Sequence, residues 1–212
     1  MQIPFSMPAQ AAGYRSVPTE TSRIAITFDD GPHPRLTPRI LDILDRYHVK
    51  ATFFMIGVIA ETYPQTAREV AERGHEIGNH TDSHRRMTGL GEERVASELQ
   101  ACSEAVERVC GKRPTLFRPP EGAVDSAVIN VAERDGYRVI LWSVDTRDWE
   151  IKDANAIVNR VLSSVKSGDI ILMHDFIGKN SQTPEALEIL LPRLLALGYE
   201  PVTVSELLGV GS

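Results

Sequence analysis

The chain has 212 residues, of which 42% are hydrophobic and 25% charged, and this composition fits one globular domain with a sizeable core. A formal net charge of −6, without a dense cluster of Lys and Arg, argues against nucleic acid as a partner. No apolar run approaches the roughly 18 residues of a membrane span, so no membrane-crossing segment is expected. Nothing in the composition calls for a partner subunit, so a monomer is favoured and the oligomeric state stays open.

The N-terminus and the cysteines say little about where the protein works. Residues 1–13 lack the basic start and long apolar run of a secretory signal, so the chain is either intracellular or a mature or truncated form of an exported protein. Cys102 and Cys110 are the two cysteines, and both fall in one predicted helix. Eight helical positions separate their Cα atoms by roughly 12 Å, whereas a disulfide needs about 7 Å or less. We therefore expect two free thiols.

Strand-like and helix-like segments alternate after an expected N-terminal leader over residues 1–22. The predicted strands are residues 23–28, 51–56, 75–78, 115–117, 138–142, 169–173 and 201–203. The predicted helices are residues 38–47, 58–73, 92–109, 126–134, 154–164 and 184–197. Glycines such as Gly74 and Gly111 stand where helices should end, directly before strand-like runs.

Strands that alternate with helices indicate parallel βαβ units, arranged either as a barrel or as an open doubly wound sheet. The polar residues favour the barrel, because they come at or just after the C-terminal ends of strands: Asp29, Asp30, His80, Arg118, Asp145 and His174. In a (β/α) barrel that rim forms the active site. We predict an α/β fold, namely an irregular (β/α) barrel of seven or eight parallel strands over residues 23–208, with a tail at 209–212.

Two histidines four positions apart, His80 and His84, can face the same way on one helical turn and share a metal ion. The spacing alone is weak, since such pairs are often ordinary surface or core histidines. Asp29 and Asp30 offer a third ligand, and two histidines with one carboxylate leave open positions, as in catalytic zinc sites. The run Asp-Asp-Gly-Pro at 29–32 could instead be only a turn, because these residue types favour turns.

A further histidine, His174, follows an apolar strand and could act as a general acid or base. Asp145 and Asp148 come after the neighbouring strand and could orient its ring through a carboxylate hydrogen bond. Trp149 offers an apolar wall beside them. The plainer alternatives are a buried histidine with satisfied hydrogen bonds and a tryptophan that only packs in the core.

Arg118 precedes two prolines, which hold it rigidly, so it could orient the carboxylate of Asp29 by charge-assisted hydrogen bonds. The alternative is a purely structural salt bridge. The turn from Pro119 to Gly122 also leaves backbone N–H groups free, and these could face an oxyanion.

Five motifs together resemble the NodB-homology polysaccharide deacetylases, a carbohydrate esterase family. They are Thr-Phe-Asp-Asp-Gly-Pro at 27–32, His-Thr-Asp-Ser-His at 80–84, Arg-Pro-Pro-Glu-Gly at 118–122, Asp-Thr-Arg-Asp-Trp at 145–149 and Leu-Met-His-Asp at 172–175. The likeness spans residues 23–208, which would then form the catalytic domain. It implies an irregular (β/α) barrel and a divalent metal ion, with zinc expected and cobalt, manganese or nickel able to serve.

The resemblance also implies roles for single residues. Asp29 would be the general base and His174 the general acid, with Arg118 holding Asp29 and Asp148 tuning His174. The metal ligands would be Asp30, His80 and His84. Trp149 and Leu172 would line a small pocket for the acetyl methyl group.

Glu121 departs from the family, which usually has tyrosine or another aromatic residue at this position. The family role belongs to the backbone N–H there, which stabilises the oxyanion, so activity need not be lost. We hypothesise that the Glu121 carboxylate pairs with the ammonium group of an amino-sugar product.

The predicted activity is removal of N-acetyl groups from N-acetylglucosamine units of a polysaccharide substrate, with peptidoglycan first and chitin oligosaccharides second. This substrate class implies a place outside a bacterial cell or in its envelope. The alternatives are an esterase acting on O-acetylated xylan with the same site, and a catalytically silent sugar-binding protein. The second would be expected to have lost at least one catalytic or metal position, and none is lost here.

Overall fold

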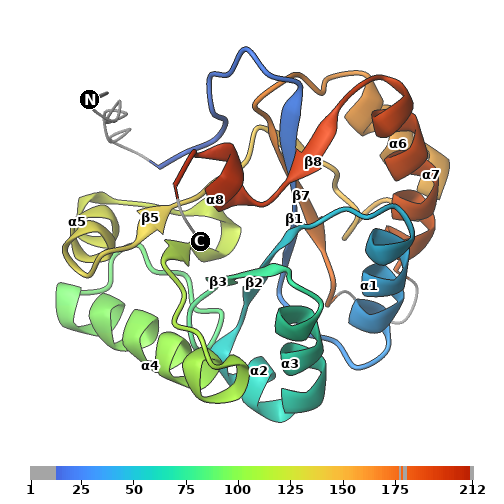
Figure 1. The fold of residues 1–212 in the computed structure, drawn as a ribbon. Coiled ribbons are helices and arrows are strands. Elements are labelled where there is room, and N and C mark those ends of the chain that lie inside the picture. The colour runs from blue at the N-terminus through green and yellow to red at the C-terminus, as the bar shows by residue number, and fades with distance from the viewer. Residues whose placement is uncertain (1–12, 177, 179–180, 211–212) are drawn as a thin grey trace, which may run out of the picture.

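The computed structural model describes residues 13–176, 178 and 181–210. Predictions for residues 1–12 of the leader and 211–212 of the tail lie outside the described residues, and the domain limits stay a prediction. Strands and helices alternate along the chain, with the helices packed around a central sheet (Figure 1). The strands are β1 (Arg23–Asp29), β2 (Thr52–Met55), β3 (Glu76–Asn79), β4 (Leu116–Phe117), β5 (Arg138–Val139), β6 (Val144–Asp145), β7 (Ile170–His174) and β8 (Glu200–Val202). The helices are α1 (Leu36–Arg46), α2 (Gly57–Thr62), α3 (Pro64–Glu72), α4 (Glu92–Cys110), α5 (Ser126–Arg134), α6 (Ala154–Leu162), α7 (Thr183–Ala196) and α8 (Val204–Leu207).

The sheet is a curled, incomplete barrel. Its strand order is β5-β4-β3-β2-β1-β7-β6, with β8 paired to the start of β1, and the strand pairs are parallel. In the described part of the chain, β5 and β6 at the two ends of this path do not pair with each other. The prediction of an irregular (β/α) barrel with seven or eight parallel strands is confirmed.

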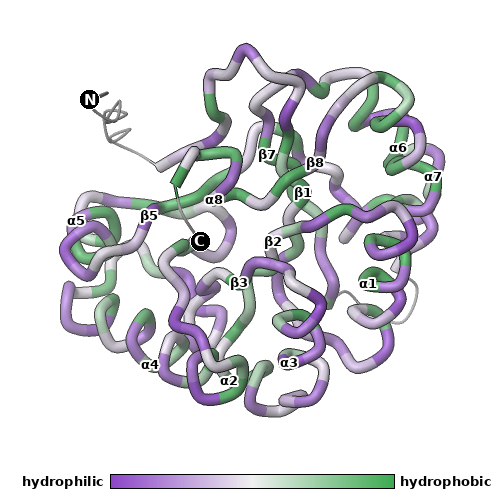
Figure 2. Tube along the Cα trace, viewed as in Figure 1, coloured by the Kyte–Doolittle hydropathy of each residue, from purple (hydrophilic) through white to green (hydrophobic). Residues whose placement is uncertain are grey.

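The apolar residues of the central strands build two cores, one on each face of the sheet. Ile24, Ile26 and Phe28 of β1 are fully buried against the helix layer that includes α1 and α7. Ala25, between them, faces the inner core, which Val204 of α8 also joins. Burial on both faces explains why these strands are hydrophobic along most of their length, as the green central strands in Figure 2 show.

An extended segment at residues 14–17 fills the opening in the barrel. Tyr14 receives a hydrogen bond on its carbonyl from Leu141 (2.7 Å) and donates one to Val139 (2.8 Å). Further on, the Val17 N–H donates to Gly168 (2.8 Å), where a Cβ would come within 1.9 Å of the Val17 carbonyl oxygen. Only glycine allows this approach. Part of the predicted leader therefore packs against the barrel.

The predicted elements differ from the structure mainly around β5. The strand predicted over residues 138–142 ends at Val139, whereas Ile140 forms an isolated bridge with Tyr14, and β6 was not predicted. The short helix α8 and a 3₁₀ turn at Pro120–Gly122 were also missed. Cys102 and Cys110 both lie in α4 and are free, as predicted.

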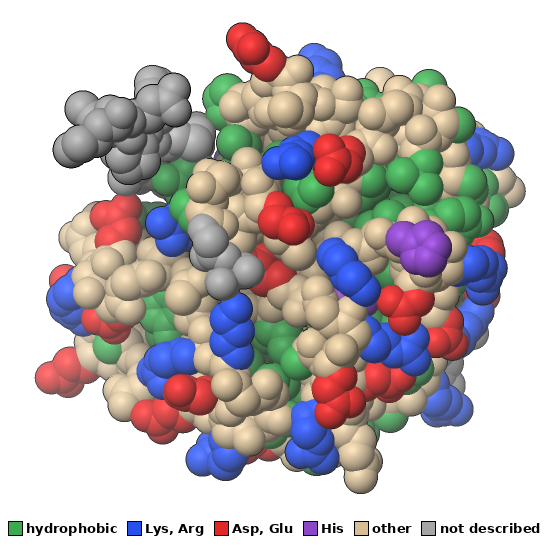
Figure 3. Space-filling model, in the orientation of Figure 1, with side chains coloured by type: hydrophobic (Ala, Val, Ile, Leu, Met, Phe, Trp, Pro, Cys, Tyr) green, Lys and Arg blue, Asp and Glu red, His purple; other side chains and the backbone are tan. Residues whose placement is uncertain are grey.

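The surface carries charges of both signs. On the face shown in Figure 3, basic and acidic side chains are interspersed among the described residues. Within the described ranges, no helix combines the length and hydropathy that crossing a bilayer requires.

Candidate active site

The C-terminal ends of the strands bring the predicted site residues together in one cleft of about 340 Å³. The cleft is lined by Asp29, Asp30, His80, His84, Glu121, Trp142, Asp145, Trp149, Leu172 and His174. Parallel strands place their C-terminal ends on the same rim, so residues far apart in sequence converge there. Arg118 and Asp148 lie directly behind this surface, fully buried.

Three side chains form a candidate metal centre. The ligand atoms of Asp30, His80 and His84 all lie within 4.8 Å of one another. One Asp30 oxygen is 3.3 Å from His80 Nε2 and 3.1 Å from His84 Nε2. Ligands about 2.0–2.1 Å from a tetrahedral ion are themselves about 3.3–3.4 Å apart, so the spacing fits zinc. Burial would raise the pKa of Asp30, but its contacts with His80 and His84 hold that pKa far below the usual range.

The local backbone, not a helix, presents the two histidines. Residues 80–84 form a loop after β3, with Thr81 (φ 65°) and His84 (φ 56°) in the left-handed region. The prediction that His80 and His84 share a helical turn is wrong; two left-handed residues fold the loop back instead. The carbonyl of Arg118 lies 2.7 Å from His80 Nδ1, so Nδ1 carries the proton and Nε2 keeps its lone pair for a metal.

Asp29 is held by a buried arginine, as the sequence predicted. Arg118 donates to an Asp29 oxygen at 2.8 Å and to the Thr27 hydroxyl at 2.7 Å. Its remaining nitrogens donate to the carbonyls of Ile140 and Leu141 at 3.3 and 3.0 Å. Arg118 is fully buried and Asp29 is 3% exposed. Three strand ends therefore fix the Asp29 carboxylate in one orientation.

His174 is paired with Asp148. One Asp148 oxygen lies 2.7 Å from His174 Nδ1, and the other accepts from the His174 backbone N–H and the Thr183 hydroxyl. Burial alone would lower the pKa of His174, but the carboxylate of Asp148, and more weakly Asp29, raise that pKa to about 9. Of the two aspartates considered as partners, Asp148 therefore takes this position. Asp145 instead accepts from the backbone N–H of Arg147.

Glu121 lines the cleft. It has φ 59°, and among the described residues its N–H makes no hydrogen bond, whereas the Gly122 N–H donates to Pro119. Its carboxylate pairs with Arg86 at 2.9 Å on the exposed rim. The Glu121 side chain is thus already engaged by a cation of this chain.

Two further residues predicted for substrate contacts line the cleft. Trp149 is 50% exposed, which is unusual for so large an apolar side chain, whereas Leu172 is buried at 4%. An exposed indole and a buried leucine in one cleft offer apolar surface for part of a substrate. Trp142, which the sequence did not single out, lines the same cleft.

Supporting residues were also missed. Thr183 orients Asp148 from a position 35 residues away, and Asp175 receives a 2.5 Å hydrogen bond from the Thr37 hydroxyl. Burial raises the pKa of Asp175 to about 7. A Cβ on Gly31 would come within 2.1 Å of the Asp175 carboxylate, so this side chain packs directly on the loop that carries Asp30. In the sequence, only its position next to His174 could have indicated that Asp175 supports the site.

Known proteins share both the sequence and the fold. A family model named polysaccharide deacetylase matches residues 16–140. A peptidoglycan-N-acetylglucosamine deacetylase of Bacillus cereus is 45% identical over 194 residues, covering 91% of this chain and 91% of that protein. The chain belongs to the polysaccharide deacetylase family. The predicted family and enzyme class are therefore confirmed.

Solved structures of this deacetylase fold superpose closely. A peptidoglycan N-acetylglucosamine deacetylase in complex with 4-naphthalen-1-yl-N-oxidanyl-benzamide gives a TM-score of 0.90 at 35% identity, covering 93% of this chain and 92% of that one. A CE4 family pseudoenzyme from Bacillus anthracis gives 0.88 at 29% identity, covering 94% and 69%. An enzyme and a pseudoenzyme thus share the fold, so individual side chains must decide activity.

Proposed function

We propose that the chain is a metal-dependent hydrolase that removes N-acetyl groups from N-acetylglucosamine units of a polysaccharide, with peptidoglycan as the leading substrate and chitin oligosaccharides second. The observation that carries this proposal is the convergence of three metal-ligating side chains with Asp29 and His174 in one cleft. Its expected place is the cell envelope or the outside of a bacterial cell, where such a polymer is found.

The ligand set suits a divalent ion of catalytic type. Asp30, His80 and His84 would hold it and leave positions open for water and substrate. When bound, such an ion lowers the pKa of a water molecule and polarises a carbonyl group. Nitrogen and oxygen donors in this ratio favour zinc, although cobalt, manganese or nickel could serve.

Asp29 is the proposed general base. Its second oxygen, the one that Arg118 does not bind, lies 3.8 Å from His80 Nε2 and so faces the metal centre. A water molecule at this centre would come within reach of that oxygen and pass its proton to it as the water attacks the acetyl carbonyl. Arg118 keeps the carboxylate oriented throughout this step.

His174 is the proposed general acid. The departing nitrogen of an amide needs a proton, because an amine leaves poorly as an anion. With a pKa raised to about 9, the imidazole is protonated at neutral pH and can supply that proton. Asp148 holds Nδ1, which leaves Nε2 as the atom that donates.

The backbone and the apolar wall complete the site. The unbonded Glu121 N–H would donate to the oxyanion of the tetrahedral intermediate. Leu172 and Trp149 would enclose the acetyl methyl group. The products are acetate and a free glucosamine amine.

The protonated imidazole favours amide over ester cleavage. An alkoxide leaves more readily than an amine anion, so an O-acetylxylan esterase would depend less on His174. A silent sugar-binding protein would not need Asp29, Arg118, His174 and Asp148 fixed by directed hydrogen bonds. Both alternatives are therefore less well supported than the N-deacetylase.

The test measures acetate release from chitopentaose, peptidoglycan and acetylxylan by the zinc-loaded wild type and by Asp29→Asn. Release from the glucosamine polymers that the substitution abolishes would support both the activity and its base. Release from acetylxylan alone would overturn the substrate and keep the site. No release from any polymer by metal-bound protein would favour the binding protein.

A further inference from the structure

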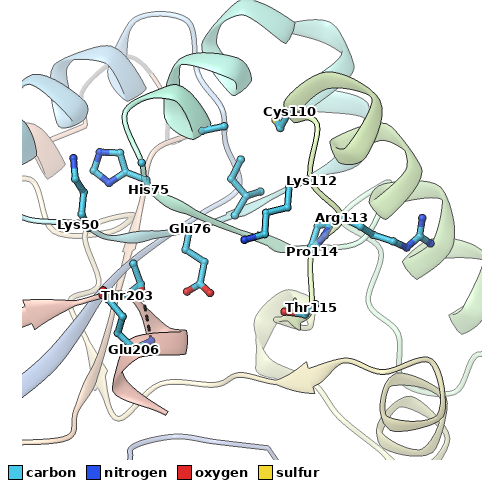
Figure 4. Close-up of a pocket in the computed structure, with 13 residues that line it drawn as sticks. Lys50, His75, Glu76, Cys110, Lys112, Arg113, Pro114, Thr115, Thr203 and Glu206 are labelled. Atoms are coloured by element: carbon cyan, nitrogen blue, oxygen red, sulfur yellow. Dashed lines mark hydrogen bonds between the residues drawn. The ribbon is translucent and has the colours of Figure 1, made fainter. Parts of the chain in front are cut away.

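A second cavity, of about 430 Å³, lies away from the catalytic cleft and shares no lining residue with it. It opens near the N-terminal ends of β3 and β4 and beside α8 (Figure 4). The predicted active site lies at the C-terminal strand ends, so the two sites are at opposite ends of the barrel. Its size is in the range of pockets that bind small molecules.

One wall of this cavity carries a cation with no partner. Lys112, on the loop between α4 and β4, makes no hydrogen bond or ion pair with any described residue, and its side chain extends into the cavity in Figure 4. The neighbouring cations differ. Lys50 donates to the carbonyl of Arg73 at 2.6 Å, and Arg113 donates to Glu107 at 3.0 Å. Lys112 is therefore the lining cation that is free to bind an anionic group.

Two carboxylates on other walls, those of Glu76 and Glu206, each accept hydrogen bonds on only one oxygen among the described residues. One oxygen of Glu76 accepts from the Thr52 hydroxyl and the Ser205 N–H. One oxygen of Glu206 accepts from the N–H and hydroxyl of Thr203. Within the described residues, the second oxygen of each accepts no hydrogen bond. The bonded oxygens fix both carboxylates in place, and the free ones can accept from a ligand.

A buried histidine lines the cavity. His75 is 6% exposed and accepts the Ala51 N–H on Nδ1 at 3.2 Å, so its neutral ring carries hydrogen on Nε2. Burial and the charge of Lys50 lower the pKa of His75 to about 4, which keeps the ring neutral. Nε2 has no partner among the described residues.

We propose that this cavity binds a small zwitterion of the amino-acid or short-peptide type. Its carboxylate pairs with Lys112, and its ammonium group lies between the free oxygens of Glu76 and Glu206. A sugar ring fits less well, because no Phe, Tyr or Trp lines the cavity, whereas two tryptophans line the catalytic cleft. A metal ion also fits less well, because the carboxylates here form no three-ligand group in the described chain.

The test follows backbone amide signals of Lys112 and Thr115 by NMR while zinc-loaded protein is titrated with diglycine. N-acetylglycine keeps only the negative charge and glycinamide only the positive one, so both serve as matched ligands. Following residues at the cavity separates this site from carboxylate binding at the catalytic metal. Lys112→Met removes the cation, and Lys166→Met is the control, because Lys166 is an exposed lysine that does not line the cavity.

We expect diglycine to shift these signals in the wild type and in Lys166→Met. Binding should weaken about tenfold in Lys112→Met and for each singly charged ligand, since each loses a charge-assisted contact. The proposal is overturned if diglycine leaves these signals unmoved up to its solubility limit. It is also overturned if Lys112→Met binds like the wild type, or if N-acetylglycine binds as tightly as diglycine.

Discussion

Two histidines lie at opposite ends of the barrel, His174 partly buried and His75 buried, and their neighbours give the two rings opposite properties. At the catalytic end, Asp148 binds Nδ1 of His174, and the pKa of His174 rises to about 9. At the other end, Nδ1 of His75 accepts a backbone N–H, burial dominates, and the pKa of His75 falls to about 4. The same residue type is thus positively charged at neutral pH in one place and a neutral hydrogen-bonding group in the other.

The two ends also differ in how their charges are partnered. At the catalytic end Arg118 holds Asp29, and Asp148 holds His174, so the proposed base and the proposed acid are both positioned before a substrate arrives. At the other end Lys112, Glu76 and Glu206 keep free hydrogen-bonding capacity. A preorganised centre suits catalysis, whereas unused capacity suits reversible binding.

Removing the base should have the largest effect. Asp29→Asn is expected to lower the rate of acetate release by about 10²–10⁴-fold, because it removes general-base catalysis. It also leaves Arg118 buried without its anion, so thermal unfolding must confirm that the variant is folded at the assay temperature. Asp42→Asn, at an exposed aspartate on α1, is the matched control. A folded Asp29→Asn protein with a wild-type rate would refute the assigned base.

Removing the partner of His174 should change the pH dependence. A general acid must be protonated, so the wild-type rate should fall only as the pH rises through about 9. Asp148→Asn removes the charge that raises the pKa of His174, so the basic limb of the kcat/KM profile should move toward pH 6.5. The decrease in kcat/KM caused by Asp148→Asn should therefore be larger at pH 8.5 than at pH 6. A parallel loss at every pH would indicate a structural role for Asp148.

The two histidines should affect stability in opposite directions. The ion pair of His174 contributes below pH 6.5, its ordinary pKa, and is lost as the pH rises through about 9. The pKa of His75 is lowered instead. The free energy of unfolding therefore decreases by up to about 3 kcal/mol as the pH falls from 6.5 to about 4. His75→Asn keeps an acceptor for the Ala51 N–H. Urea unfolding should show that this variant loses less free energy of unfolding than the wild type between pH 6.5 and pH 4. An equal loss in both proteins would contradict a lowered pKa for His75.

Changing the side chain of Glu121 should have the smallest effect. Its catalytic contribution is assigned to the backbone N–H, so Glu121→Gln should leave kcat nearly unchanged. Because its carboxylate is exposed and already paired with Arg86, the affinity for a glucosamine product should fall only about two- to fivefold. Product inhibition measures this. An unchanged inhibition constant would count against a contact between Glu121 and the amine.

The rim of the barrel could be predicted because strand ends can be read from the sequence. Asp29, Arg118 and His174 each follow apolar residues and His80 follows a short strand, and parallel strands bring such strand-end positions together. The pairing of Arg118 with Asp29 and of Asp148 with His174 matched the expectation from residue chemistry. Local patterns were enough wherever the strand itself sets the direction of the side chain.

Loops and long-range contacts could not be predicted in the same way. The fold of the loop at 80–84 depends on left-handed backbone at Thr81 and His84, and Thr81 is β-branched, a residue type that rarely adopts this conformation. The packing of residues 14–17 into the barrel depends on the space at Gly168. The second cavity combines residues of β3, α3, α4, α8 and several loops, which no local pattern relates.

The most direct test of the account is whether zinc at the Asp30, His80 and His84 centre controls activity. Chelator-treated protein should release no acetate from chitopentaose, and about one equivalent of zinc per chain should restore the rate. His84→Gln should bind zinc weakly and stay inactive, whereas His48→Gln, at an exposed histidine outside the cleft, should behave like the wild type. Full activity in metal-free protein, or normal zinc binding by His84→Gln, would contradict the account.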